Sequence, residues 1–153
     1  MLMNVILGWI IPWCIGSYFL RKDSAVFLHI APIAIVIAFV FNEVGYQMQW
    51  WRVTPTGWGV LSILPYNLGV FPVIPCLLIY TVRRSSLNPL LLLLISTICK
   101  TLMELCLMLA GKVIYDHGWN LGWTFVSYLL ACSLCFGWYL IVKGRLQGYK
   151  YSG

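Results

Sequence analysis

Charge is scarce in this chain, and the scarcity limits what the protein can be. Only 9% of its 153 residues are Asp, Glu, Lys or Arg, and only four of them are acidic. An ordinary soluble domain has about 25% charged residues, so the composition excludes a water-soluble fold. The G-x-S-x-G, H-E-x-x-H and glycine-rich phosphate-loop motifs are also missing from the sequence. The sequence therefore lacks the common signatures of hydrolases, zinc proteases and nucleotide-binding proteins.

Metal and redox signatures are lacking as well, although the chain has six cysteines. Cys132 and Cys135 form a C-x-x-C, but they lie within a long apolar segment. A thiol there stays protonated and packs as a small hydrophobic group. No set of His, Cys, Asp and Glu has the spacing of metal ligands. We therefore predict no catalytic residue, no metal and no cofactor.

What the chain has in abundance is apolar sequence, which makes up 61% of its residues. A hydrocarbon core about 30 Å thick needs roughly 20 apolar residues per helix, and the chain has room for five such spans. We place them at residues 2–20, 24–41, 57–82, 87–111 and 118–142. The predicted fold class is all-α, with residues 1–153 forming a single transmembrane domain. That domain is a five-helix bundle of a multi-pass membrane protein.

Basic residues mark every second gap between these spans. They are Arg21-Lys22, Arg83-Arg84 and the tail residues Lys143, Arg145 and Lys150, whereas the other gaps hold only Arg52 and Lys112. The positive-inside rule then predicts the N-terminus outside and the C-terminus inside. Tryptophans near the basic-poor gaps predict an interfacial belt on the outer face: Trp50, Trp51, Trp58, Trp119 and Trp123. Since membrane orientation explains the net charge of +6, we expect the lipid bilayer as a partner and no nucleic acid.

The fourth predicted span contains two charged residues, Lys100 and Glu104. They are four residues apart, so they share a helix face and can pair. A charge at the centre of a span costs about 2.5–3.5 kcal/mol on insertion scales, so both should face the bundle interior. A structural ion pair and a site for an ion, a proton or a polar ligand stay open as alternatives.

Three prolines and a glycine fall between Pro65 and Pro75 in the third span. Proline removes a backbone donor and disfavours helix at the preceding residue, so we predict an interruption near Pro65 to Pro72. Broken membrane helices line binding sites in transporters; the alternative is a kinked helix that only shapes packing. Asn67 lies in this segment at a depth similar to that of Glu104, and we expect the two to be in contact.

The fifth span carries polar residues at helical spacing, among them Asn120, Thr124 and Tyr128. Such faces usually pack helices closely, and lining of a cavity is the alternative. The candidate ligand-binding residues are thus Asn67, Lys100, Glu104, Asn120, Thr124 and Tyr128. We expect them to form a polar cluster in the outer half of the bundle.

Several short motifs from about Trp50 onward form a recognisable pattern. They are Trp50 to Val53, Leu64 to Val73, Glu104, the turn from Gly111 to Tyr115, Trp119 and Tyr128. In these motifs the chain resembles a family of small five-span membrane proteins of endospore-forming bacteria. A proline often follows the family's glutamate, whereas this chain has Leu105. The resemblance implies the five-helix fold and the bacterial cytoplasmic membrane, and it implies no activity.

The sequence thus predicts a membrane protein without enzymatic activity. It would bind or pass a small polar species or ion through the polar cluster. One alternative is an accessory or structural subunit that packs against a partner membrane protein or a second copy of the chain. A membrane-embedded enzyme is a second alternative.

Overall fold

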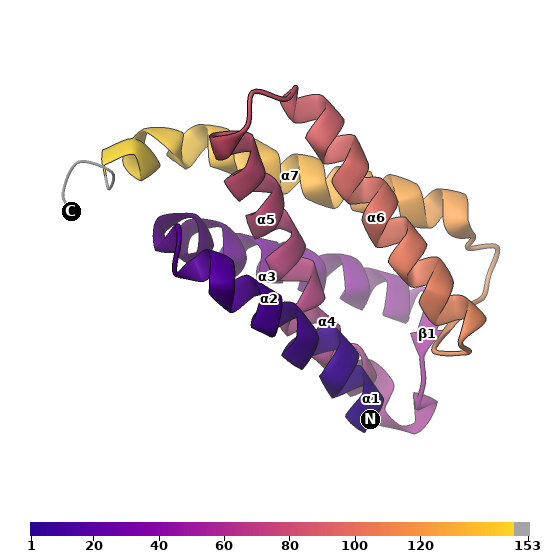
Figure 1. The fold of residues 1–153 in the computed structure, drawn as a ribbon. Coiled ribbons are helices and arrows are strands. Elements are labelled where there is room, and N and C mark those ends of the chain that lie inside the picture. Colours follow the sequence, from indigo (N-terminus) through magenta and orange to yellow (C-terminus); the bar gives the residue numbers. More distant parts are fainter. Residues whose placement is uncertain (149–153) are drawn as a thin grey trace.

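Five helical segments that are long and apolar enough to cross a membrane run through the computed structural model (Figure 1). The structure describes residues 1–148, and the side chains of residues 1–144. The five segments are Leu2–Leu20, Ser24–Gln47, Thr56–Arg84, Pro89–Leu109 and Leu121–Gly144. They confirm a multi-pass helical membrane protein. Lys150, from the predicted basic tail, lies outside the described residues.

Three of the five segments are single helices, and two are composite. The single helices are α3 (Ser24–Gln47), α6 (Pro89–Leu109) and α7 (Leu121–Gly148). The first segment consists of α1 (Leu2–Val5), the π-helical η1 (Ile6–Ile10) and α2 (Ile11–Leu20), and the third consists of the 3-10 helix η2 (Thr56–Ser62), α4 (Leu64–Leu68) and α5 (Val70–Arg84). Helix α3 continues six residues past the end of the second predicted span, and α7 continues six residues past the end of the fifth.

Side-chain caps begin the two helices that carry the candidate site. Asn88 Oδ1 accepts the Leu90 N–H at 2.9 Å before α6, and Pro89 occupies the first turn, where it loses no helical bond. Asn120 Oδ1 accepts the Gly122 N–H at 2.9 Å and so caps the start of α7. Asn120 is exposed, and its predicted role in a ligand-binding cluster stays a prediction. The capping role explains why the residue is an asparagine.

A two-stranded antiparallel sheet joins the loops at one end of the bundle, which the all-α prediction missed. Strand β1 (Trp51–Val53) pairs with β2 (Val113–Tyr115), so that Trp51 lies opposite Tyr115. Gly111 ends α6 with φ 68°, and the Gly111 and Lys112 N–H groups return to the Met108 and Leu107 carbonyls. This glycine-dependent helix ending directs the chain into β2. We call this end of the bundle the sheet end.

The third segment is interrupted where its prolines predict. Gly69, with φ −127° and ψ −82°, separates α4 from α5. Pro72 cannot donate to the Leu68 carbonyl four residues earlier. The Trp13 indole N–H takes that position instead, 2.7 Å from the Leu68 oxygen. A side chain of the first segment thus satisfies the Leu68 carbonyl, for which lipid offers no donor.

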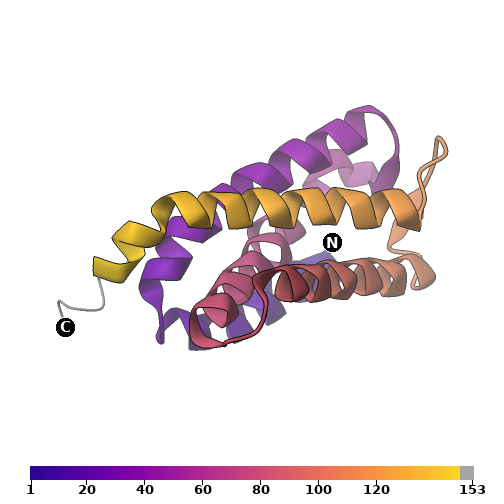
Figure 2. The same cartoon turned by 90° about the horizontal axis from the view of Figure 1, so that it is seen from above.

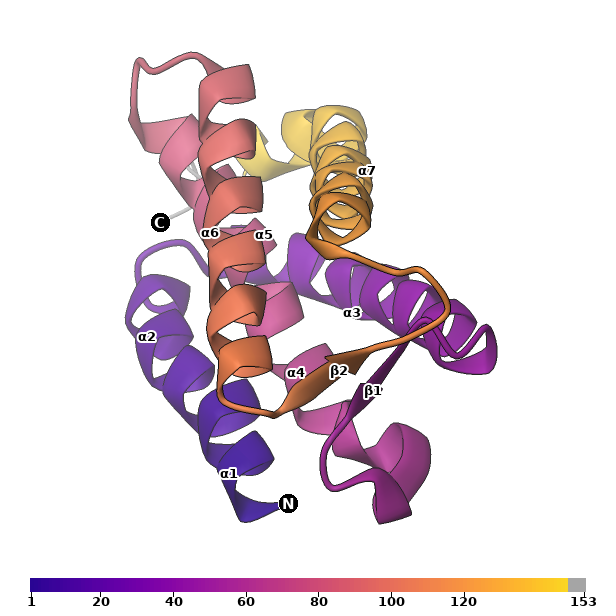
Figure 3. The same cartoon turned by 90° about the vertical axis from the view of Figure 1, so that its right-hand side faces the viewer.

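The helices pack around α5 in two separate cores. One core joins α3, α5, α6 and α7 and includes Ile30, Ile79 and Cys132. The other lies at the sheet end and includes Trp51 and Tyr66. Helices α3 and α7 approach each other at the end away from the sheet and separate toward the sheet end (Figures 2 and 3).

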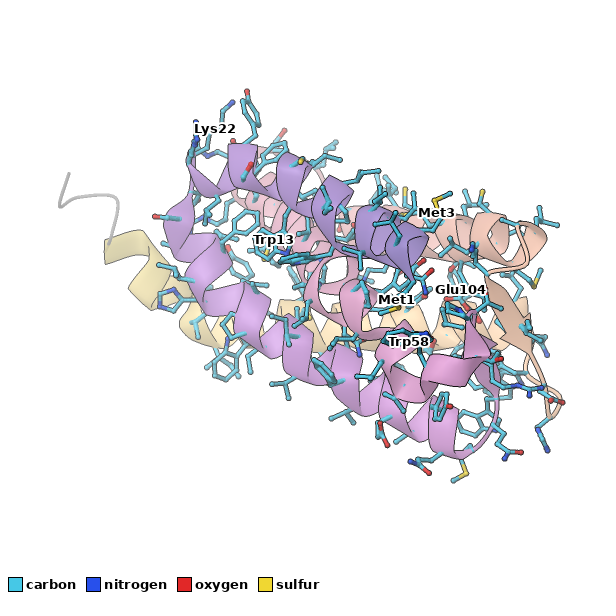
Figure 4. The ribbon with its side chains drawn as sticks, turned by 90° about the horizontal axis from the view of Figure 1, so that it is seen from below. Met1, Met3, Trp13, Lys22, Trp58 and Glu104 are labelled. Carbon is cyan, nitrogen blue, oxygen red and sulfur yellow. The ribbon has the colours of Figure 1, made fainter. Side chains whose placement is uncertain are left out.

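Two basic residues and a cluster of tryptophans lie at opposite ends of the bundle. Lys22 lies at the end opposite Met1 and Trp58 (Figure 4). At the Lys22 end, Arg83 pairs with Asp23, Nε to Oδ2, at 3.4 Å. Tryptophans gather at the sheet end, where the rings of Trp50, Trp51, Trp119 and Trp123 contact one another. Lys22 and Arg83, which come from two of the basic groups in the sequence, therefore lie at the same end of the fold.

Candidate functional site

The carboxylate of Glu104 on α6 is the centre of a cluster of hydroxyl groups. Tyr115 of β2 donates to Oε1 at 2.6 Å, and Thr124 of α7 donates to the same oxygen at 3.2 Å. Tyr128, one turn further along α7, donates to Oε2. Two helices and a strand therefore meet at this one side chain, which lies toward the sheet end of the bundle (Figure 4).

Hydroxyl groups supply hydrogen-bond donors to both oxygens of the Glu104 carboxylate, so the cluster needs no cation. Each hydroxyl has a single proton, and three hydroxyls can direct theirs at the two carboxylate oxygens. The Trp119 indole N–H donates to Thr124 Oγ1 at 2.9 Å and so orients that hydroxyl. Burial raises the pKa of the Tyr115 phenol, and the Glu104 charge raises it further, which keeps the phenol a donor. Charge-assisted hydrogen bonds of this kind are about twice as strong as neutral ones.

Lys100 lies one helical turn from Glu104 but does not pair with it. Its side chain is buried, with 4% of the residue exposed. Among the described residues, no carboxylate lies within ion-pair distance of Nζ; the nearest recorded partner is the Tyr128 ring, with its centroid 5.7 Å from Nζ. The predicted Lys100–Glu104 pair is therefore wrong, although the predicted interior position of Lys100 is confirmed. The hydroxyl groups have taken the place that the ammonium would occupy.

Asn67 lies elsewhere than predicted. It is 1% exposed, but its Oδ1 accepts the side-chain amide N–H of Asn42 on α3 at 2.7 Å. All recorded bonds of Glu104 go to Tyr115, Thr124 and Tyr128. The expected contact between Asn67 and Glu104 is therefore wrong. Asn67 instead fixes the short helix α4 against α3.

A cavity of about 720 Å³ lies beside these residues. Its walls come from all five segments and from both strands, and most of the side chains are apolar, for example Phe41, Phe71 and Leu107. Lys100 and Glu104 belong to the few polar positions of the wall. Ligand pockets in proteins occupy about 300–1,000 Å³ and combine apolar walls with a few placed polar groups. The cavity fits that description.

Aromatic side chains close the cavity at the sheet end and leave it open along α6. Trp51 and Trp119 line it with ring centroids 4.7 Å apart. On α6, the lining residues Leu102 and Met103 are 53% and 43% exposed. The opening therefore faces sideways, toward the surface that contacts lipid.

The structure thus brings together Lys100, Glu104, Thr124 and Tyr128, and it leaves Asn67 and Asn120 in structural roles. It also adds Tyr115, which the sequence reasoning missed as a site residue. The signal was present in the turn from Gly111 to Tyr115, but only the pairing of β2 with β1 directs Tyr115 to Glu104. The sequence predicts Trp119 only as part of the interfacial belt, and nothing in it indicates the bond of Trp119 to Thr124.

Comparison with families of known proteins, with curated proteins and with solved structures finds no match to this chain. The resemblance to the five-span proteins of endospore-forming bacteria stays a prediction.

Proposed function

We propose that this chain is a multi-pass protein of the bacterial cytoplasmic membrane that binds a small molecule in the cavity between its helices. The observation that supports this is a cavity of about 720 Å³ with the buried Lys100 in its wall. Apolar walls favour a ligand with an apolar body over the passage of bare ions, which need a polar path. Binding is favoured over catalysis because three hydroxyl groups hold Glu104, so its carboxylate is not free to act as a base.

A cavity-filling variant tests the proposal. Ala131 of α7 lines the cavity, whereas Leu134 of the same helix is 54% exposed and does not line it. We expect tritiated dodecanoate or dodecanol to bind the purified protein in phosphatidylcholine nanodiscs saturably, in excess of empty nanodiscs. The Ala131→Trp variant should lose this binding, and Leu134→Trp should keep it. Equal binding by both variants would place the probe outside the cavity and refute the proposal.

The proposed orientation has the N-terminus and the sheet end outside and the arginine residues inside, since basic residues favour the cytoplasmic face. Thr56 and Ser86 are both exposed, one near the sheet and one in the loop after α5. In intact cells a membrane-impermeant maleimide should label Thr56→Cys and leave Ser86→Cys unlabelled. The wild-type chain, with its six cysteines, gives the background. Labelling of Ser86→Cys alone would reverse the proposed orientation.

A further inference from the structure

We infer that the cavity selects an amphiphile with a single anionic group, whose acid binds the ammonium of Lys100 while its apolar body fills the rest. This inference rests on the proposed binding function and names the class of ligand. It follows from the surroundings of Lys100, from the hydrogen bonds of Glu104 and from the depth of the site.

Lys100 is a buried residue whose ammonium has no hydrogen-bond acceptor among the described residues. It is 4% exposed, it lines the cavity, and its recorded contact is with the face of the Tyr128 ring. No ion pair or hydrogen bond to another described residue is recorded for Nζ. A buried charge is normally paired and hydrogen-bonded, and intramembrane ionisable residues are normally functional. The missing partner of Lys100 is therefore an anion that enters the cavity.

Glu104 does not meet this need, although it is the acid nearest along the helix. Its oxygens already accept from Tyr115, Thr124 and Tyr128. The Tyr128 hydroxyl is thereby held on Glu104 while its ring contacts Lys100. The cluster keeps the carboxylate away from the ammonium and leaves the Lys100 charge available to a ligand.

Depth decides which anion can reach this position. Lys100 is eleven residues from the start of α6 at Pro89 and nine from its end at Leu109. At about 1.5 Å per residue it therefore lies roughly 16 Å and 14 Å from the two helix ends. Phospholipid headgroups lie at the surfaces of a hydrocarbon core about 30 Å thick, too far away to contact this ammonium. The ligand must carry its acid into the cavity as a whole molecule.

The wall supplies what the rest of such a molecule needs. Phe41 and Leu107 give the cavity apolar surfaces, and the exposed Leu102 and Met103 mark its open side along α6. A ligand dissolved in the bilayer can enter there without crossing the sheet end. A single-chain carboxylic acid or a compact apolar acid can pair with Lys100, reach the depth of the site from the bilayer and contact the apolar wall.

Binding of tritiated dodecanoate and dodecanol, measured side by side, tests the inference, because the two differ only in the charged group. The wild-type chain in phosphatidylcholine nanodiscs, at about pH 8 where the acid is ionised, should bind dodecanoate about tenfold more tightly than dodecanol. The Lys100→Met variant should lose this preference by weakening dodecanoate binding about tenfold while dodecanol binding stays unchanged. The Lys100→Arg variant retains the charge and should retain the preference for the acid.

The outcomes separate this inference from the proposed function. Equal affinity of the wild type for both probes, or a preference that survives Lys100→Met, would overturn the inference and leave the binding function standing. Saturable binding of neither probe would overturn both.

Nanodiscs of phosphatidylglycerol separate a free acid from a lipid headgroup. We expect dodecanoate binding to the wild type to be unchanged in them. If phosphatidylglycerol abolishes dodecanoate binding to the wild type but leaves the residual binding to Lys100→Met unchanged, then Lys100 binds a lipid headgroup. That result would overturn the proposal of a free acid as the ligand.

Discussion

Replacement of Lys100 by methionine is predicted to make the ligand-free protein more stable. Methionine has nearly the same length and fills the same space, and it removes a charge that is 4% exposed and has no anionic partner among the described residues. Replacing buried ionic groups by apolar residues of similar volume often stabilises a protein by about 1–4 kcal/mol. We expect a gain in that range for Lys100→Met, because the substitution removes no ion pair among the described residues and loses only the contact of Nζ with the Tyr128 ring.

The neighbouring acid should respond in the opposite direction. Glu104→Ala removes the acceptor of three hydroxyl donors, those of Tyr115, Thr124 and Tyr128. One hydrogen bond to a charged group contributes about 1.5–3 kcal/mol, so the loss should be at least about 1.5 kcal/mol. Two ionic residues one helical turn apart would then have effects of opposite sign, which a mutual ion pair does not produce.

Both changes can be measured as free energies of unfolding in mixed micelles with a rising fraction of dodecyl sulfate. The eight tryptophans report the transition by fluorescence, and delipidated protein gives the ligand-free state. Lys143→Met, on an exposed site of α7, is the matched control and should change stability by less than about 0.5 kcal/mol. A Lys100→Met variant that is less stable than the wild type by about 1 kcal/mol would refute the prediction, since Lys100 would then have a partner within the folded chain.

Three further changes test the packing of the first segment and the sheet end. A side chain at Gly69 would overlap the backbone of the first segment, so Gly69→Ala should lower the unfolding temperature. Gly57 has open space around it, so Gly57→Ala should leave the unfolding temperature unchanged. Equal effects of the two substitutions would contradict this packing. Trp13→Phe leaves the Leu68 carbonyl without its donor and should cost about 1–3 kcal/mol in the same micelle assay. The pKa of Asp116 is lowered because its carboxylate accepts a backbone N–H. The stability this group contributes is complete above the usual carboxyl pKa and is lost as pH falls through the lowered value. Lowering the pH below about 4 should therefore reduce the thermal unfolding temperature of the wild type more than that of Asp116→Asn. Unfolding temperatures that fall in parallel for the two proteins would contradict this.

The sequence predicts those features of the fold that depend on local composition. Spans can be located because lipid requires continuous apolar residues, and the break at Gly69 because Pro72 and its neighbours cannot continue a helical ladder. The interior position of Lys100 follows from the cost of exposing a charge to lipid. Each of these conclusions needs only a short window of sequence.

The remaining features depend on contacts between distant residues, which no short window contains. Strands β1 and β2 have three residues each, too few for a period-two pattern to be recognised. The sequence predicts similar depths for Asn67 and Glu104, but depth does not fix the direction of a side chain around its helix. The spacing of Lys100 and Glu104 predicts a possible contact, yet the hydroxyl of Tyr115, on the distant strand β2, donates to this carboxylate instead.

The walls and the opening of the cavity give an independent reason to expect an occupant. Apolar walls favour contact with an apolar occupant over contact with water, and the space of about 720 Å³ is open along α6. In the membrane this space is therefore accessible either to lipid chains that enter along α6 or to a ligand. A lipid chain satisfies the apolar walls and leaves Lys100 unpaired, whereas an amphiphilic acid satisfies both, so the acid is the better occupant.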